Sequence, residues 1–172
     1  MVINNELKFA EKVILIDGDL GMANVNVLLN IVPTYNLMHV INKKKTMREI
    51  IMDTEFGIKF IAGANGFSKI ANLSVEELEY FAKQFSSLGN ADIIIIDTGA
   101  GIADSVVRFA SIADTVIVVT QPEPTAITDA YAFMKVVSQS YNIKKIKVVF
   151  NRVDDLQNSE NVYKSLKGVA DK

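Results

Sequence analysis

The sequence has no cysteine and no tryptophan, only three prolines, and no long hydrophobic run. Without cysteine the chain cannot form disulfides or thiolate metal sites, which fits a reducing cytoplasm. Its apolar runs are short compared with the roughly 18 residues needed to cross a bilayer, and no secretory signal is visible. These absences predict a soluble, cytoplasmic chain.

The charge of the chain is nearly balanced. Lys and Arg total 18 and Asp and Glu total 20, which gives a net charge of −2 at pH 7. Nucleic-acid-binding surfaces are usually strongly basic, so the composition gives no support for nucleic-acid binding. With 172 residues, 49% hydrophobic and 22% charged, the chain is long enough to bury a core. We expect one domain over residues 1–172.

Short apolar runs rich in β-branched residues alternate with stretches of helical periodicity. Because the runs do not alternate between polar and apolar residues, they are typical of strands covered on both faces in a mainly parallel sheet. The predicted strands are 13–16, 58–62, 93–96, 115–120 and 146–150. We therefore expect an α/β fold with three layers, in which helices cover both faces of the sheet.

Several helices carry start signals. Ser74 with Glu77 and Thr46 with Glu49 have the spacing of a capping box, in which each side chain bonds the backbone N–H of the other. The clearest helix spans 125–141, where apolar residues recur every three or four positions and form one stripe.

Two of the predicted strands end in carboxylates. Asp17 and Asp19 follow the first strand, and Asp97 follows the run of four isoleucines. The carboxyl ends of parallel strands meet at one edge of a sheet, where ligands bind in open α/β folds. Carboxylates there can hold a hydrated Mg²⁺ or orient a water beside it. Asp17 itself is interpreted as a structural residue or as one that positions the residues of the site without touching the ligand.

Five motifs in order give the chain a resemblance to a known family. They are DGDLGMANVNVLL at 17–29, YNLMHVI at 35–41, DTGAGI at 97–102, PEPTAITDAY at 122–131 and NRV at 151–153. The chain resembles the MinD/ParA-type deviant-Walker ATPases, on the flagellar FlhG (FleN/YlxH) branch. The resemblance implies a P-loop NTPase fold of the SIMIBI class, with ATP and Mg²⁺ as cofactors.

The resemblance also implies roles for single residues. Asp19 matches the aspartate that orients the hydrolytic water, and Asp97 matches the one that reaches Mg²⁺ through water. The remaining matches are to nucleotide-binding positions, namely Gly101, Pro122, Pro124, Asn151 and Arg152. Asn151 matches the adenine-recognising position, whereas Arg152 is open between a contact to the base and a surface ion pair.

One motif of the family does not occur in the sequence. The Gly-rich loop with Lys before Ser or Thr is absent, and the chain resembles a family member without its first strand, its phosphate loop and its C-terminal end. We therefore expect weak or absent ATP binding by this chain alone. The absent strand would lie between 93–96 and 115–120, so we expect that the sheet closes up or that a second copy fills the gap.

The C-terminal segment 161–172 places Val162, Leu166 and Val169 on one helical face, which is typical of a helix packed on a core. The membrane-seeking segment of the family lies further on. The chain itself is therefore not expected to bind a membrane, whereas a longer protein would associate with the inner face of the cell membrane.

Three function classes follow. The first is an ATP-hydrolysing spatial regulator of flagellar number and placement, which binds ATP and ADP, forms a homodimer and acts on flagellar assembly proteins. The second is a partner-binding module without nucleotide chemistry, and the third is a ParA-type DNA-partitioning ATPase, which the acidic balance disfavours. A phosphoacceptor receiver domain is not supported, because the lysine expected after a late strand is not matched around Asn151.

Other polar features have simpler interpretations. His39, the single histidine, is interpreted as a packed or hydrogen-bonded helix residue, because no nucleophile accompanies it. The run 43–45 of three lysines is interpreted as a solvated loop, and Gly63 as part of a turn.

Overall fold

The computed structural model describes residues 12–19, 23–63, 74–141, 143, 145–154, 160, 162–164 and 166–167. The chain divides into two compact units, Met1–Gly99 and Ala100–Lys172, and each is described by itself. Within the described residues, no helix has both the length and the apolar composition needed to cross a membrane.

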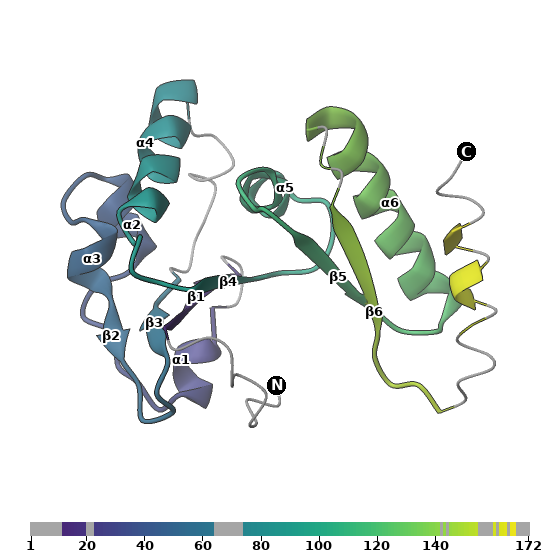
Figure 1. The fold of residues 1–172 in the computed structure, drawn as a ribbon, viewed down its shortest axis with the longest axis horizontal. Coiled ribbons are helices and arrows are strands. Elements are labelled where there is room, and N and C mark those ends of the chain that lie inside the picture. Colours follow the sequence, from purple (N-terminus) through teal and green to yellow (C-terminus); the bar gives the residue numbers. More distant parts are fainter. Residues whose placement is uncertain are drawn as a thin grey trace. The chain divides into compact units, whose positions relative to one another are not determined.

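The first unit contains a four-stranded, mainly parallel sheet (Figure 1). Its strands are β1 (Val13–Gly18), β2 (Met52–Asp53), β3 (Lys59–Ile61) and β4 (Ile93–Thr98). The strand order is β2-β3-β1-β4, with β1 parallel to both β3 and β4 and β2 antiparallel to β3. All six residues of β1 are buried, as expected for a central strand with both faces covered.

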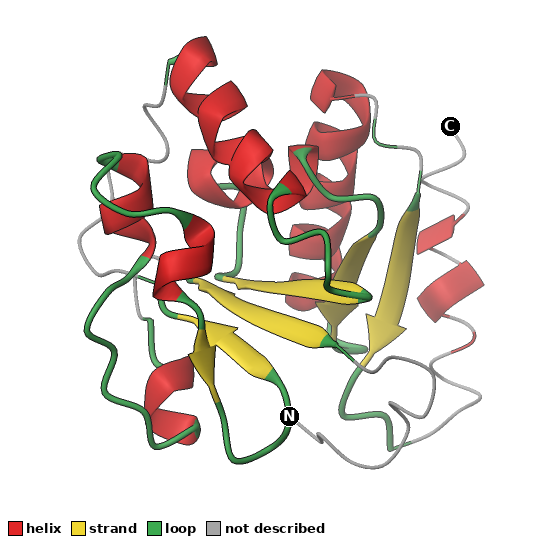
Figure 2. Ribbon diagram, turned by 60° about the vertical axis from the view of Figure 1, so that its left-hand side comes forward, coloured by secondary structure: helices red, strands yellow, loops and turns green. Residues whose placement is uncertain are grey.

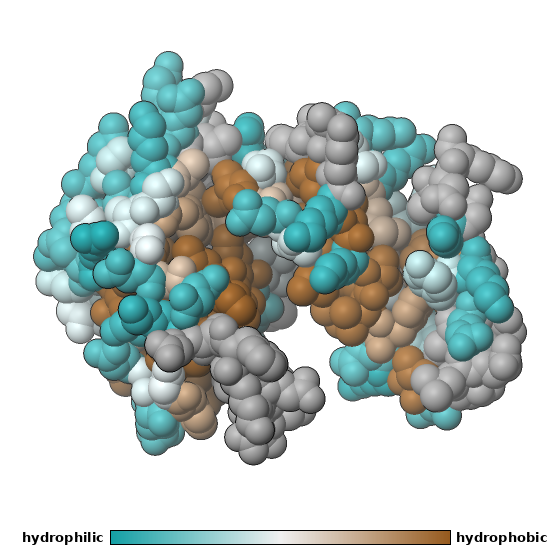
Figure 3. All heavy atoms as spheres, in the orientation of Figure 1, coloured by the Kyte–Doolittle hydropathy of each residue, from teal (hydrophilic) through white to brown (hydrophobic). Residues whose placement is uncertain are grey.

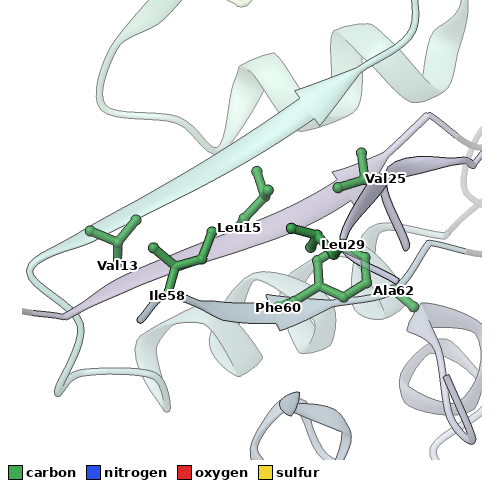
Figure 4. Close-up of a cluster of buried hydrophobic side chains, with 7 residues drawn as sticks. All are labelled: Val13, Leu15, Val25, Leu29, Ile58, Phe60 and Ala62. Atoms are coloured by element: carbon green, nitrogen blue, oxygen red, sulfur yellow. The ribbon is translucent and has the colours of Figure 1, made fainter. Parts of the chain in front are cut away.

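Helices lie on both sides of this sheet (Figures 1 and 2). They are α1 (Val25–Leu28), α2 (Leu37–Ile41), α3 (Met47–Ile50) and α4 (Val75–Ser86). On the α1 side, a core cluster joins β1, α1 and β3 (Figure 4) and consists of Val13, Leu15, Val25, Leu29, Ile58, Phe60 and Ala62. Both predicted capping boxes are confirmed, at the starts of α3 and α4.

Strand β4 departs from the sequence-based expectation. Ile93 and Ile95 are 42% and 46% exposed, although the apolar run predicted coverage on both faces. Their register partners in β1 are Val13 and Leu15, which lie under α1. That expectation is therefore wrong for β4, because the four-residue helix covers β1 and β3 but leaves the same face of β4 open.

The second unit is a parallel strand pair with helices. Its elements are α5 (Asp104–Ser111), β5 (Val116–Thr120), α6 (Pro124–Tyr141) and β6 (Ile146–Phe150). Its core contains Val107 and Ala110 of α5, Val116 and Val118 of β5, and Ala130 and Val137 of α6. The predicted helix 125–141 is thus confirmed to within one residue at its start.

The other face of β5 and β6 is open. Ile117, Val119 and Val149 are 59%, 64% and 46% exposed, and brown apolar surface is visible over this part of the molecule in Figure 3. Coverage of both faces was therefore wrong here too, since α5 and α6 pack on the side of Val116 and Val118.

The strand predictions are confirmed with small shifts in their ends, and β2 was missed. The described strands form two sheets, one in each unit. The hypothesis that the sheet closes up around the absent strand stays a prediction. A second copy in the gap stays a prediction. In the C-terminal segment Leu166 is buried, as predicted, and Val169 lies outside the described residues.

Candidate functional site

Strands β1 and β4 bring their carboxylates to the same edge of the first sheet. Asp17 and Asp97 are register partners in the parallel ladder, so their side chains point to the same face. Asp19 follows one residue after β1 ends and adds a third negative charge that acts on both neighbours. The sequence prediction that these three residues meet is confirmed.

The Asp17 carboxylate accepts hydrogen bonds from the backbone of the segment that follows β1. The residue is 1% exposed, and its Oδ1 and Oδ2 accept hydrogen bonds of 3.2 Å from the backbone N–H groups of Asp19 and Val25. These bonds tie the end of β1 to the first turn of α1, which satisfies a donor that a helix start leaves without an intrahelical partner. The structural interpretation of Asp17 is confirmed.

Two glycines make room for the carboxylates. A Cβ atom on Gly99 would lie 3.1 Å from Oδ1 of Asp19, so a larger residue there would crowd that carboxylate. A Cβ atom on Gly63 would lie 2.5 Å from the backbone oxygen of Asp17. The loop after β3 can therefore lie against the end of β1 only because position 63 has no side chain.

The electrostatics of the cluster favour a proton or a cation. Burial raises the pKa of Asp17, opposed in part by the two backbone hydrogen bonds. The pKa of Asp97 is also raised, first because protein atoms displace water around its carboxyl group and then because Asp19 repels its negative charge. The folded chain therefore binds protons at this edge more readily than the unfolded chain does.

This difference predicts a falling stability as pH rises. Groups whose folded pKa is raised stabilise the fold fully below their unfolded pKa, near 3.8, and lose that contribution as pH passes their folded pKa. Urea unfolding followed by circular dichroism from pH 4 upward should show this decline. Asp97→Asn should reduce its slope, because this variant removes one of the two carboxyl groups whose pKa is raised. An unchanged slope in Asp97→Asn would contradict the assignment.

The donor set fits magnesium through water better than direct coordination by protein alone. No group of three acidic, histidine or cysteine side chains in the described part of the chain is arranged to hold a metal ion. Magnesium usually keeps several of its waters and takes one or two carboxylates, together with phosphate oxygens. Asp97, which is exposed at the end of β4, suits such a water-mediated contact.

In the second unit the ends of β5 and β6 also meet. The Asn151 N–H donates to the Thr120 carbonyl oxygen at 2.8 Å, which continues the parallel ladder and places Asn151 beside the turn that leads into α6. Pro124 is the first residue of α6, where a missing N–H costs nothing. Buried Thr120 closes the turn, because its hydroxyl donates to the Ala126 carbonyl oxygen.

A hydrogen bond between neighbouring residues fixes the backbone at Asn151 and Arg152. Arg152 has a φ of +52°, and its N–H donates to Asn151 Oδ1 at 2.9 Å. Both side chains are exposed. The structure thus groups Pro122, Pro124, Asn151 and Arg152 in one unit and Asp19 and Asp97 in the other, with Gly101, at a φ of +92°, in the loop before α5.

Sequence reasoning missed the functions of Gly63, Gly99 and Thr120. Gly63 carried no signal beyond that of a turn, because its close neighbour, Asp17, is far away in the sequence. Thr120 was only the last residue of an apolar run, and its polar side chain could have marked a strand end that turns into a helix. His39 is confirmed as a hydrogen-bonded helix residue, since Nδ1 contacts Oδ1 of Asn36 at 3.0 Å.

No family model matches this chain, but several known proteins are similar to it in sequence. The antiactivator FleN of Pseudomonas aeruginosa is 35% identical over 162 residues, which are 94% of this chain and 58% of FleN. The flagellum site-determining protein YlxH of Helicobacter pylori is 34% identical over 160 residues, 92% of this chain and 54% of YlxH. This chain therefore spans little more than half the length of these relatives.

The fold is also found among solved structures. The septum site-determining protein MinD of Pyrococcus horikoshii, in complex with Mg-ADP, superposes with a TM-score of 0.72 at 23% identity. The match covers 89% of this chain and 65% of that protein. It shows that the two chains share an α/β fold.

Proposed function

From the similarity of this chain to FleN and YlxH, we propose that it is a MinD/ParA-type ATPase and that it carries the magnesium and water side of a nucleotide site in an ATP-dependent regulator of flagellar number and placement. The observation that carries the proposal is the register of Asp17 with Asp97, which brings Asp19 and Asp97 to one strand edge. Asp17 fixes the loop so that the Asp19 carboxylate lies against Gly99.

Each carboxylate has a separate role in this proposal. With magnesium nucleotide bound, Asp97 would hold a water of the Mg²⁺ ion, and Asp19 would orient the water that attacks the terminal phosphate. Bound Mg²⁺ would supply positive charge that offsets the repulsion among the three carboxylates and polarises the phosphate oxygens. The Mg-ADP complex of the MinD from Pyrococcus horikoshii supports magnesium nucleotide as the ligand class.

The resemblance also leads us to propose adenine recognition for residues of the second unit, which is considered by itself. Asn151 and Arg152 lie beside the turn that contains Pro122 and Pro124, and their exposed polar groups suit the edge of an adenine. We further propose that ATP binding favours a homodimer of the regulator, that hydrolysis reverses it, and that flagellar assembly proteins and the inner face of the cell membrane are its partners.

The sequence lacks a phosphate-binding loop, so this chain is proposed to bind Mg-ATP weakly by itself. Titration with a fluorescent ATP analogue, with and without Mg²⁺, tests that proposal. We expect no saturable Mg²⁺-dependent signal. Saturable binding would reveal a phosphate site elsewhere in the chain and would contradict the proposal that the chain itself binds Mg-ATP weakly.

The carboxylate cluster itself can be tested without nucleotide. Mn²⁺, which prefers the same oxygen ligands as Mg²⁺ and broadens nearby NMR signals, should broaden the amide resonances of Asp19 and Gly99 first. Mg²⁺ in excess should reverse the broadening. Asp97→Asn should weaken the effect about tenfold, whereas Asp114→Asn should not change it. Broadening that is equal in wild type and Asp97→Asn would refute the metal assignment.

A nucleotide-free partner-binding module is the second candidate. The exposed apolar residues of β5 and β6 favour it, because contiguous apolar surface commonly marks an interface. If Mn²⁺ leaves the Asp19 and Gly99 signals unchanged, this candidate becomes the better account.

A further inference from the structure

A groove of about 610 Å³ lies in the first unit at the end of the sheet away from the carboxylates. It is lined by residues at the start of β1, by the β2–β3 hairpin and by the loop that leads from α4 to β4. Val13, which lines it, precedes Asp17 by four strand residues, which at about 3.3 Å each places the groove about 13 Å from the carboxylate cluster. Figure 4 shows Val13 beside Ile58 at this end of the core.

The groove has an apolar floor. Val13, Ile14, Ile58 and Leu88 are each no more than 6% exposed, and all of them line it. Ile51 and Ala91 extend the same surface and are half-buried. A volume of this size lies within the range that small-molecule sites occupy, and an apolar floor contributes affinity through burial of a ligand's hydrocarbon part.

The rim of the groove is cationic. Lys12, Arg48 and Lys59 line it. Among the described lining residues the one carboxylate is that of Asp53, which Lys59 Nζ contacts at 2.6 Å. Asp92, which lies beside the groove, accepts a hydrogen bond from the Lys12 backbone N–H. The rim therefore keeps an excess of positive charge, and Arg48 is its best-placed donor.

Arg48 is oriented but not neutralised. Its Nε donates to the Ser87 carbonyl oxygen, which fixes the guanidinium at the mouth of the groove. Among the described residues no ion pair includes Arg48. Its two terminal nitrogens can therefore bind an anion in a bidentate manner, which is the geometry that guanidinium groups offer to carboxylates and phosphates.

We propose that this groove binds a small amphiphilic anion, an aliphatic chain that carries one carboxylate or phosphate group. The hydrocarbon part packs on the floor formed by Val13, Ile58 and Leu88, and the anionic group binds Arg48. The site is independent of the carboxylate cluster, because the two lie at opposite ends of β1 and share no residue.

Titration of ¹⁵N-labelled chain with octanoate tests the proposal. Saturable shifts are expected at the amides of Ile51, Gly57 and Ala91, and octanol, which has the same chain without the charge, should bind about tenfold more weakly. Arg48→Gln should also weaken octanoate binding about tenfold, whereas Arg108→Gln, in the second unit, should not. Lys12→Gln provides a second rim variant with a smaller expected loss.

Circular dichroism of each variant establishes that it is folded before its affinity is compared. Three results would overturn the proposal: no saturable shift with octanoate, shifts centred on Ile117 and Val119 instead of the groove, or equal affinity in wild type and Arg48→Gln. Use of octyl phosphate in place of octanoate then distinguishes the two anionic groups.

Discussion

Replacement of Phe60 by alanine is expected to lower the free energy of unfolding of the first unit by about 3–5 kcal/mol. Phe60 has no exposed surface and lies in β3 within the core cluster on the α1 side. Because the surrounding side chains can fill only part of the space that the ring leaves, the loss combines hydrophobic transfer with a cavity. Urea unfolding monitored by circular dichroism measures the change.

Phe56 provides a matched control for this experiment. It is the same residue type four positions away, 50% exposed in the turn between β2 and β3. Phe56→Ala should therefore change the free energy of unfolding by only about 0.5 kcal/mol, as is usual for surface positions. Similar losses in the two variants would show that the cluster around Phe60 is not the core of the unit.

Gly63→Ala is the second change with a large expected effect, about 1–3 kcal/mol of destabilisation. The added methyl carbon would lie 2.5 Å from the backbone oxygen of Asp17 and 3.3 Å from Cβ of Ala23. Because the first neighbour is main chain at the end of a buried strand, it cannot move aside as a flexible side chain would. The end of β1 must shift, and Asp19 shifts with it.

The same variant therefore links stability to the site. We expect Gly63→Ala to weaken Mn²⁺ broadening at Asp19 as well as to lower the urea midpoint. Gly89→Ala is the control, since its nearest neighbour, the Ser86 carbonyl oxygen, would lie 3.3 Å away and needs to move only slightly. Equal destabilisation by the two substitutions would mean that contact with Asp17 does not limit position 63.

Features encoded locally could be predicted from the sequence. The capping boxes at Thr46 and Ser74 depend on residues three positions apart, and the helix that ends at Tyr141 depends on one repeating stripe. The meeting of Asp17 and Asp97 could also be predicted, because parallel strands bring their carboxyl ends to one edge.

Features that depend on distant residues could not be predicted in this way. Strand β2 has two residues and no periodicity, and it forms because the turn with Gly57, at a φ of +74°, folds it back onto β3. The need for glycine at position 99 arises because Asp19, at the end of a different strand, lies against it. Neither leaves a local pattern in the sequence.

The exposure of Ile95 shows a second limit of prediction from the sequence, which concerns burial. An apolar run indicates that a strand can be buried on both faces, but the residues that cover each face come from elsewhere in the chain. In the first unit α1 is only four residues long, so it covers Leu15 and leaves Ile95 exposed. Hydrophobicity therefore predicts the capacity for burial and not its extent.

The open face of β5 and β6 also has a colloidal consequence. Ile117, Val119 and Val149 present β-branched side chains to water on one face of this strand pair. Such surfaces attract one another, so encounters between molecules, whose frequency rises with the square of concentration, limit the lifetime of the chain in solution. Dilution would then prolong that lifetime.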